Sequence, residues 1–273
     1  MRSSPRGARA GGGVKEPVSA IPLLLFGATG RMGMEIRKLL AASDEAAHFT
    51  LAECVASGGP EGECPPGCRW VTASAFHADA LEALPPDAVV LDVSLAAGTE
   101  SLVAALEKTP RAAVLATTGL SDPLESRIEA LGRKTAILRA RNLSLGVAVA
   151  RRWLALLPPA ARAAYVADIV EHHHAGKKDA PSGTALDLAA ALGAIGSARR
   201  PGGAVATHSI RAGSVPGTHR VVLSGDGETL EVVHTVTDRS VFARGALRAA
   251  RFVHGRAPGL YTVDDLIHDS RTP

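Results

Sequence analysis

Residues 21–33 read Ile21-Pro-Leu-Leu-Leu-Phe-Gly27-Ala-Thr-Gly30-Arg-Met-Gly33. The apolar run Ile21–Gly27 is typical of a buried parallel strand. Ile36, Leu39 and Leu40 follow at helical spacing. A strand, a glycine-rich turn and a helix in this order are the context that a dinucleotide-binding turn requires. An ordinary strand-to-helix turn has the same order, so the glycine pattern alone is a weak signal.

The three glycines of this turn have separate expected roles. Gly27 permits the tight turn after the strand, and Gly30 lets backbone N–H groups approach a pyrophosphate. Gly33 lets the new helix pack closely on the strand.

Further apolar runs continue the alternation of strands and helices. We expect strands over Phe49–Ala56, Ala88–Ser94, Ala112–Thr118 and Thr135–Arg139, and helices over Gly98–Leu106 and Leu124–Leu131. This alternation indicates a doubly wound parallel sheet, whose ligands bind at the carboxyl ends of the strands. The glycine turn should therefore share one crevice with Ser94, Thr117, Thr118 and Asn142.

The second half of the chain has a different pattern. A helix over Gly146–Leu157 precedes a short strand over Tyr165–Val170, and three β-like segments follow at Val205–Arg211, His219–Ser224 and Glu231–Thr237. These four strands predict an open mixed sheet with one face covered by helices. The expected fold class is α/β, with an N-terminal Rossmann-type doubly wound parallel sheet and a C-terminal α+β domain.

The expected domain division follows from these patterns. Residues 21–143, completed by 241–273, form a dinucleotide-binding domain, and residues 144–240 form a domain for substrate binding and oligomerisation. Residues 1–20 are rich in Arg, Gly and Ser and carry no apolar segment. We expect a disordered extension there, with an organelle transit peptide as the alternative.

Composition excludes several classes of protein. The 273 residues are 46% hydrophobic and 21% charged, which is ordinary for a soluble protein with a buried core. A net charge of +3 and 3% aromatic residues argue against nucleic acid as a partner. No apolar run approaches the length of a membrane span. Three cysteines without a signal peptide predict reduced thiols and a cytoplasmic location.

One segment carries the candidate chemistry. Glu171–Ala185 reads Glu-His-His-His-Ala-Gly-Lys-Lys-Asp-Ala-Pro-Ser-Gly-Thr-Ala, which predicts three histidines and two lysines in a loop. A helix over Ala185–Leu192 follows, with Ser182 and Thr184 among its start signals. The free N–H groups and the dipole of a helix start favour an anion, and Gly183 lets it come close. The segment therefore predicts capture of a carboxylate beside histidines that can move protons.

Two other interpretations of this segment stay open on its residues alone. Most helix starts bind nothing, and most lysine pairs are solvated. The histidines could also hold a metal, but no cysteine lies near them and carboxylates at ligand spacing are not evident. Cys64 and Cys68 bracket Pro-Pro-Gly and could be half a zinc site, but a second ligand pair is missing. We expect an ordinary loop there and no metal.

The segment resembles a known signature. Its pattern Glu171-x-His173-His174-x-x-Lys177-x-Asp179-Ala-Pro-Ser-Gly-Thr-Ala185 is similar to that of the dihydrodipicolinate reductases, also called 4-hydroxy-tetrahydrodipicolinate reductases. Ala116–Gly119 is similar to the family's Gly-Thr-Thr-Gly loop, and Arg211–His219 to its Arg-x-Gly-x-x-x-Gly-x-His segment. The resemblance runs from about Leu23 to Ile267.

The resemblance implies an enzyme of the diaminopimelate route to lysine. It implies reduction of a small cyclic dicarboxylate by NADH or NADPH, and a homotetramer built on the free face of the mixed sheet. It implies His173 as proton donor and Lys177 as a second proton-handling or carboxylate-pairing residue. The implied substrate-binding residues are His174, Ser182, Gly183 and Thr184. The implied cofactor-binding residues are Gly27, Ala28, Thr29, Gly30, Arg31, Met32, Gly33, Ala56, Ser57, Ala116, Thr117, Thr118, Ala140, Arg141, Asn142 and Leu143.

Cofactor preference is the open point of this resemblance. An acid at the end of the second strand binds the ribose hydroxyls of NAD, whereas a basic residue favours the 2′-phosphate of NADP. Here Ala56 and Ser57 stand at the discriminating positions, and Glu53 fits there only if the preceding loop is shortened. We expect use of both cofactors, with Ser57 at the ribose.

Two rival classes are disfavoured. A dehydrogenase that acts through an acyl-cysteine needs a thiolate in the second half of the chain, and no cysteine follows Cys68. A sensor that binds a dinucleotide and keeps a dead substrate domain has no need of His173, Lys177 and the Ser182–Thr184 segment together. An enzyme is therefore the expected class.

Overall fold

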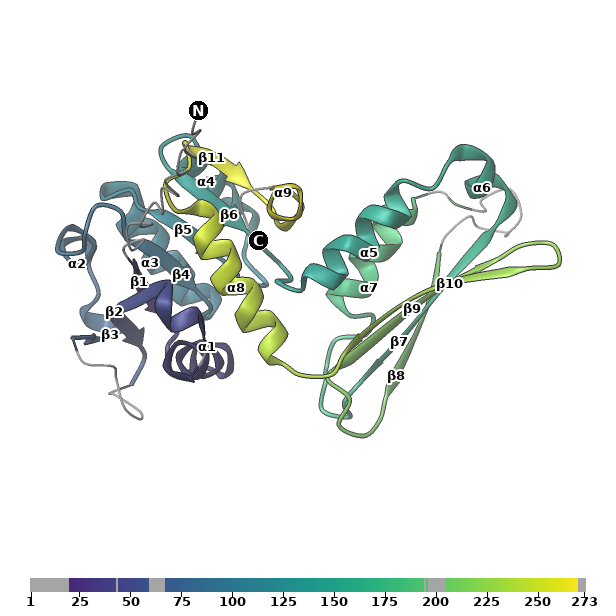
Figure 1. Cartoon of the computed structure of the whole chain (residues 1–273), viewed down its shortest axis with the longest axis horizontal. Helices are drawn as coiled ribbons and strands as arrows, with labels where there is room; N and C mark the ends of the chain where they lie inside the picture. The colour runs from purple at the N-terminus through teal and green to yellow at the C-terminus, as the bar shows by residue number, and fades with distance from the viewer. Residues whose placement is uncertain (1–19, 43, 59–66, 194, 196–204, 270–273) are drawn as a thin grey trace, which may run out of the picture.

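The structure is a computed structural model that describes residues 20–42, 44–58, 67–193, 195 and 205–269. Two sheets organise these residues, and Figure 1 shows them at opposite ends of an elongated molecule. The predicted extension over residues 1–20 and the predicted loop at Cys64 lie outside the described residues, apart from residue 20.

The first sheet has seven parallel strands in the order β11-β6-β5-β4-β1-β2-β3. The strands are β1 (Ile21–Phe26), β2 (Phe49–Ala56), β3 (Arg69–Thr72), β4 (Val89–Asp92), β5 (Ala112–Leu115), β6 (Ala136–Arg139) and β11 (Gly259–Tyr261). The chain reverses its direction of winding at β1, which lies between β2 and β4. The carboxyl ends of β1 and β4 therefore border the crevice where such sheets bind ligands.

Helices cover both faces of this sheet. On one face lie α1 (Arg31–Ala42), α8 (Ser240–Val253) and α9 (Val263–His268). On the other lie α2 (Ala78–Glu82), α3 (Ala96–Lys108) and α4 (Asp122–Gly132). Alternation along β1 accounts for the two cores, because Leu23 and Leu25 join the first core whereas Leu24 and Phe26 join the second.

The second sheet is mixed and has the order β10-β9-β7-β8. Its strands are β7 (Val166–His173), β8 (Ala206–Arg211), β9 (Gly217–Ser224) and β10 (Thr229–Val236). β7 pairs parallel with β8 and antiparallel with β9. Helices α5 (Leu145–Ala155) and α7 (Gly183–Leu192) cover one face with a small apolar core. Within the described chain, the other face of this sheet is not covered, and Ile210 and Val233 are 45% and 49% exposed there.

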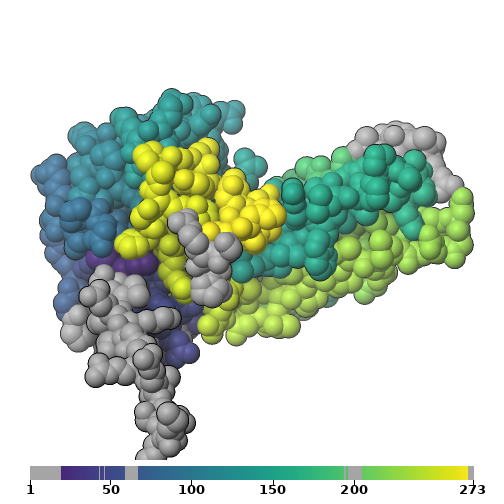
Figure 2. All heavy atoms as spheres, turned by 45° about the horizontal axis from the view of Figure 1, so that its top comes forward, coloured from purple at the N-terminus to yellow at the C-terminus, as the bar shows by residue number. Residues whose placement is uncertain are grey.

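The chain crosses between the two sheets twice, after β6 and again between β10 and α8 (Figure 1). The second crossing returns α8 to the first sheet, and β11 then pairs with β6 at its edge. The space-filling view separates the same two lobes, with the yellow C-terminal segment packed on the larger one (Figure 2). The last helices, α8 and α9, also belong to the core of the first sheet.

The predicted fold class is confirmed, and the differences are local. The short strands β3 and β11 were not expected, nor were the short helices α2, α6 (Pro159–Ala164) and α9 or the 3-10 turns Asp44–Ala47 and Ala73–Ala75. The strand expected to end at Val170 runs on to His173, so placing His172 and His173 in a loop is wrong. Pairing with both β8 and β9 extends this strand. None of the described helices is long and apolar enough to span a bilayer.

Candidate active site

The turn after β1 is shaped by close backbone contacts. Gly27 has a φ of +92°, and a Cβ there would lie 2.8 Å from the Cα of Ser94. A Cβ on Gly33 would lie 2.2 Å from the Gly27 carbonyl oxygen, so α1 packs directly on the turn. The Gly30 N–H donates to the same carbonyl over 3.0 Å. Only residues without a side chain fit this turn at Gly27 and Gly33.

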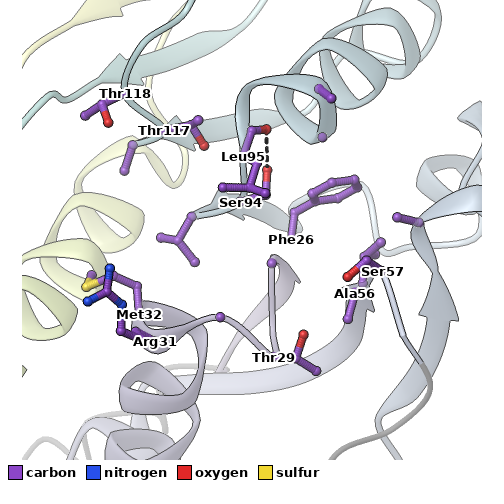
Figure 3. Close-up of a pocket in the computed structure, with 18 of the residues that line it drawn as sticks. Phe26, Thr29, Arg31, Met32, Ala56, Ser57, Ser94, Leu95, Thr117 and Thr118 are labelled. Atoms are coloured by element: carbon purple, nitrogen blue, oxygen red, sulfur yellow. Dashed lines mark hydrogen bonds between the residues drawn. The ribbon is translucent and has the colours of Figure 1, made fainter. Parts of the chain in front are cut away.

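A cavity of about 920 Å³ opens at this turn, over the carboxyl ends of β1, β2, β4 and β5. Figure 3 shows Arg31 and Met32 at the start of α1, across the cavity from Ala56 and Ser57. The other residues of its wall that the sequence predicts are Gly27, Thr29, Gly30, Ser94, Ala116, Thr117, Thr118, Arg141, Asn142 and Leu143.

A buried carboxylate holds two sides of this cavity together. Asp92, at the end of β4, is fully buried and accepts hydrogen bonds from the Ser94 hydroxyl at 2.6 Å, the Thr99 hydroxyl at 2.5 Å and the Thr117 hydroxyl at 3.1 Å. Burial raises the pKa of Asp92, and these hydrogen bonds oppose the increase. Asp92 thereby fixes Ser94 and Thr117, which face the cavity from neighbouring strands.

A second cavity of about 1130 Å³ lies between the two lobes. Its wall includes all six residues expected to act on the substrate: His173, His174, Lys177, Ser182, Gly183 and Thr184. Six residues line both cavities: Arg31, Met32, Thr118, Arg141, Asn142 and Phe242. The two cavities therefore adjoin each other and share a wall at these six residues.

His173 lies at the end of β7 and is 7% exposed. Its Nδ1 contacts the Glu171 carboxylate, which in turn accepts a hydrogen bond from Arg211 Nη2 at 2.6 Å. Burial lowers the pKa of His173 and the Glu171 charge opposes this decrease, while Lys177 and Arg211 lower it further. The pKa of His173 ends below its ordinary value. Burial raises the pKa of Glu171, but hydrogen bonds, from Arg211 first, bring it to about 2.

Two more histidines of the mixed sheet lie within hydrogen-bonding distance of the serines that cap α5 and α7. His219 Nε2 is 3.1 Å from the Ser182 hydroxyl, and His234 Nε2 is 3.2 Å from the Ser144 hydroxyl. Ser182 caps α7 and Ser144 caps α5. Burial, together with the charge of His173, lowers the pKa of His219 to about 4, so His219 is neutral near pH 7.

The start of α7 offers an open approach to an anion. Ser182 accepts a hydrogen bond from the Ala185 N–H at 3.2 Å, and a Cβ on Gly183 would meet no atom within 4 Å. Asn142 Nδ2 donates to Thr184 Oγ1 over 2.8 Å and joins this helix start to the segment after β6. Lys177 Nζ is 2.8 Å from Asp179 Oδ1 at the same mouth. This arrangement suits a carboxylate at the first turn of α7.

The chain matches two family models that together span both lobes. Residues 21–143 match "Dihydrodipicolinate reductase, N-terminus", and residues 146–267 match "Dihydrodipicolinate reductase, C-terminus". The chain belongs to the dihydrodipicolinate reductase family. The resemblance expected from the motifs is thereby confirmed.

Curated relatives agree with this family over most of their length. The 4-hydroxy-tetrahydrodipicolinate reductase of Stenotrophomonas maltophilia (strain K279a) is 40% identical over 245 residues, 90% of this chain and 97% of the relative. The enzyme of the same name from Xylella fastidiosa (strain 9a5c) is 39% identical over 249 residues, 91% of this chain and 99% of the relative. The dipicolinate-bound dihydrodipicolinate reductase from Paenisporosarcina sp. TG-14 has the same fold, with a TM-score of 0.75, 19% identity and coverage of 90% and 99%.

Three of the residues expected to bind cofactor in this member of the dihydrodipicolinate reductase family lie behind the cavity wall. Ala28 is fully buried and Ala140 is 2% exposed, both in the first core. Gly33 packs against the turn itself. The methyl groups of Ala28 and Ala140 pack in this core, and none of the three residues belongs to the cavity wall. The other thirteen expected residues line it.

The structure corrects the alternative role of Glu53. Its side chain is 1% exposed and forms an ion pair with Arg69 on the neighbouring strand β3. Burial raises the pKa of Glu53, and Arg69 opposes the increase. Glu53 does not line the cavity, whereas the exposed Ser57 does. Ser57 therefore lies at the cavity wall where β2 ends, and Glu53 does not.

The sequence did not assign a site role to Asp92, Glu171, Arg211, His219 or Phe242. An acid at the end of an apolar strand was the available signal for Asp92. Glu171, His173 and His219 also bring one ligand atom each within 4.8 Å of one another, so the statement that no carboxylate lies at ligand spacing is wrong. Arg211 beside Glu171 disfavours a cation at this group, because its charge already neutralises the carboxylate.

Proposed function

We propose that this protein reduces 4-hydroxy-tetrahydrodipicolinate, or its dehydrated form dihydrodipicolinate, to tetrahydrodipicolinate with NADH or NADPH. This reaction belongs to the diaminopimelate route to lysine. The observation that carries the proposal is the wall shared by the two cavities. The glycine turn opens into one, and His173, Lys177 and the start of α7 open into the other.

The first cavity fits a dinucleotide. The turn at Gly27 and Gly33 has no room for side chains, and it leaves the backbone N–H groups before α1 accessible to a pyrophosphate. Ser57 would hold a ribose, and Thr117 and Thr118 would border the nicotinamide, with Thr118 at the shared wall. When bound, the reduced nicotinamide supplies the hydride.

The second cavity fits a dicarboxylate. One carboxylate would lie at the N–H groups of Gly183 and Thr184, which point out of the first turn of α7. Lys177 and His174 would pair with substrate oxygens from the loop after β7. Asn142 would hold the Thr184 hydroxyl in place during this contact.

His173 would act as the proton donor. After hydride addition, the substrate is an electron-rich enamine. The C=C electron pair of the enamine takes a proton from His173 Nε2 to form the new C–H bond, and the nitrogen lone pair forms the ring C=N bond. A histidine donor contributes typically about 10²–10⁴-fold to such a step. Lys177 would stabilise the negative charge on the bound substrate.

We expect both NADH and NADPH to serve as cofactor. Ser57 is polar and uncharged, so it favours neither the ribose hydroxyls nor a 2′-phosphate strongly. Steady-state KM values for the two cofactors test this expectation directly, and a strong bias toward either would contradict it.

We also expect two domains with separate roles and assembly of several chains. Residues 21–143, completed by 241–273, would bind the cofactor, and residues 144–240 would bind substrate and build a homotetramer in the cytoplasm. The uncovered face of the mixed sheet, with Ile210 and Val233 half exposed, supports this assembly. Light scattering on the purified protein measures the number of chains.

The decisive experiment follows the loss of NAD(P)H absorbance with freshly made dihydrodipicolinate. The wild-type protein should turn over, and His173→Gln should lower kcat by about 10²–10⁴-fold with little change in cofactor KM. His172→Gln is the matched control. His172 faces the other side of β7, where its Nε2 lies 3.1 Å from the Ala212 carbonyl oxygen. Near-normal turnover by His173→Gln would remove this residue from the reaction.

A further inference from the structure

Polar residues form a row across the mixed sheet on the face that α5 and α7 cover. The strand register places Glu171 beside Ser209 on β8 and His219 on β9, and places His219 beside His234 on β10. Buried polar groups are costly unless their hydrogen-bonding capacity is used. This row lies next to His173, because residues two apart on a strand share a face.

Glu171 is the centre of this row. Its side chain is 0% exposed. Its Oε1 accepts from Arg211 Nη2 at 2.6 Å and from the Ser182 N–H at 3.3 Å. Its Oε2 contacts His173 Nδ1. One carboxylate thus touches the expected proton donor, the cap of α7 and a guanidinium.

Arg211 keeps this carboxylate in place. The same Nη2 that binds Glu171 also donates to the Asp179 carbonyl oxygen at 2.5 Å, in the loop that leads to α7. The pair neutralises the buried charge, and burying a carboxylate requires such a partner. The Ser209 side chain also hydrogen-bonds this carboxylate. Glu171 is therefore held in one orientation by several donors, with its Oε2 against His173 Nδ1.

We propose that Glu171, held by Arg211, is a positioning residue that fixes the ring orientation and the tautomer of His173. The Nδ1 of His173 then carries the ring proton and directs it at Glu171 Oε2. The other ring nitrogen, Nε2, points away from Glu171 beside Gly217, where a Cβ would come within 3.0 Å of it. The catalytic consequence of this arrangement rests on the proposed function, but the tautomer does not.

Three charged or titratable groups face His173 besides Glu171. Arg211 and Lys177 lower its pKa, and the ring of His219 lies 5.0 Å away between centroids. Of these neighbours, Glu171 alone favours the imidazolium. Removing the Glu171 charge should therefore lower the pKa of His173 further. The decline in rate that follows loss of the His173 proton should then occur at lower pH.

The test is Glu171→Gln in the full-length protein. The glutamine side chain has one acceptor oxygen and one donor NH₂ group. Arg211 and the Ser182 N–H both donate to the position of Oε1, so they require the acceptor oxygen there. The amide NH₂ would then face His173 Nδ1 and make it an acceptor. Nitrogen-15 NMR of histidine-labelled protein should show the Nδ1–H tautomer in the wild type and the Nε2–H tautomer in the variant. The His173→Gln spectrum assigns the signal.

The kinetic readout is the pH profile of kcat. The limb of this profile that reports loss of the His173 proton should move to lower pH by at least about one unit. At pH values above that limb, kcat should fall roughly tenfold. Dissociation of pyridine-2,6-dicarboxylate should change less than about threefold, because Glu171 does not line the cavity. An unchanged tautomer, or an unchanged pH profile with near-normal kcat, would overturn the proposal.

The chain provides a matched control on the same strand. Asp168 Oδ1 lies 3.0 Å from His208 Nε2 on the opposite face of β7 and β8. Asp168→Asn removes a carboxylate–histidine pair from the same sheet and should leave the His173 signal and the pH profile unchanged. A shift of the same size there would mean that any charge change on this sheet acts on His173, and it would contradict a specific role for Glu171.

Two further measurements keep the result interpretable. If Glu171→Gln leaves Arg211 unpaired and unfolds the protein, Glu171→Gln with Arg211→Gln removes both charges, and it should still lose the wild-type tautomer. Spectra before and after treatment with EDTA should be identical, whereas a change would make His173 Nδ1 a metal ligand and overturn the proposal. A tautomer change without any effect of His173→Gln on turnover would support the positioning role and refute the proposed function.

Discussion

Asn142 Nδ2 donates to Thr184 Oγ1 over 2.8 Å, and this hydrogen bond joins the segment after β6 to the first turn of α7. Asn142 is fixed on its other side, because its Oδ1 accepts from the Ser144 N–H at 2.8 Å. Asn142 also lines both cavities. One amide therefore links the wall shared by the two cavities to the start of α7.

A double-mutant cycle on this pair should reveal the link. Asn142→Ala and Thr184→Val each remove one partner, and each should weaken binding of pyridine-2,6-dicarboxylate. We expect a coupling free energy of about 0.5–1.5 kcal/mol between them, the usual range for one hydrogen bond. Titration calorimetry on the four proteins measures it. Strictly additive effects would mean that the hydrogen bond does not hold Thr184 for its ligand.

Gly183→Ala should separate substrate binding from stability. A Cβ at this position meets no protein atom within 4 Å, and alanine favours the helix that begins here. Thermal unfolding should therefore be unchanged or slightly raised. The methyl group would occupy the space through which a carboxylate reaches the backbone, so KM for the substrate should rise about tenfold. Unchanged KM together with unchanged stability would remove the start of α7 from the substrate site.

Much of this fold could be predicted because its signals are local. β1, the glycine turn and α1 follow one another directly, and β2 has the bounds that its apolar pattern predicts. β3 and β11 were missed because each has four residues or fewer and a mostly half-exposed or exposed pattern. Such short edge strands are defined by pairing with β2 and β6, which the sequence of the edge strand does not encode.

The candidate site was predictable only in part for the same reason. His173, Lys177 and Ser182 lie within one segment, so their spacing suggested a common role. The partners of Glu171 lie far along the chain, since Arg211 is 40 residues away, and His219 joins only through the pairing of β7 with β9. Register between distant strands brings these groups together, and no local spacing predicts that register.

Ser57→Asp should make the protein selective for NADH. Ser57 is exposed at the cavity wall where β2 ends, and a carboxylate there would repel a 2′-phosphate and accept from ribose hydroxyls. We expect the NADPH to NADH ratio of KM values to rise at least about tenfold, which corresponds to a repulsion of about 1.4 kcal/mol between the new carboxylate and the 2′-phosphate. Steady-state kinetics with each cofactor measures the ratio.

Two variants control for this prediction. Ser57→Ala adds no charge and should keep the wild-type ratio. Glu53→Gln should also keep it, because Glu53 is buried against Arg69 behind the wall, although the variant should be less stable. A change in cofactor ratio caused by Glu53→Gln would restore this residue as the discriminating acid.

His219 should make stability depend on pH on the acidic side of neutrality. Its pKa is lowered from 6.5 to about 4 in the folded protein by burial. Between these values the unfolded chain takes up a proton that the folded chain does not, so the free energy of unfolding falls as the pH falls. The full effect is about 3 kcal/mol. His173 and His234, whose pKa values are also lowered, contribute in the same direction.

Urea unfolding at a series of pH values from about 7.5 to about 4.5 tests this linkage. His219→Gln cannot titrate but can still bond to Ser182, so it should have a shallower decline in unfolding free energy than the wild type. His48→Gln removes an exposed imidazole and should keep the wild-type slope. Parallel curves for the wild type and His219→Gln would mean that His219 is protonated equally in the folded and unfolded chain, and the buried neutral imidazole described for this site would then be wrong.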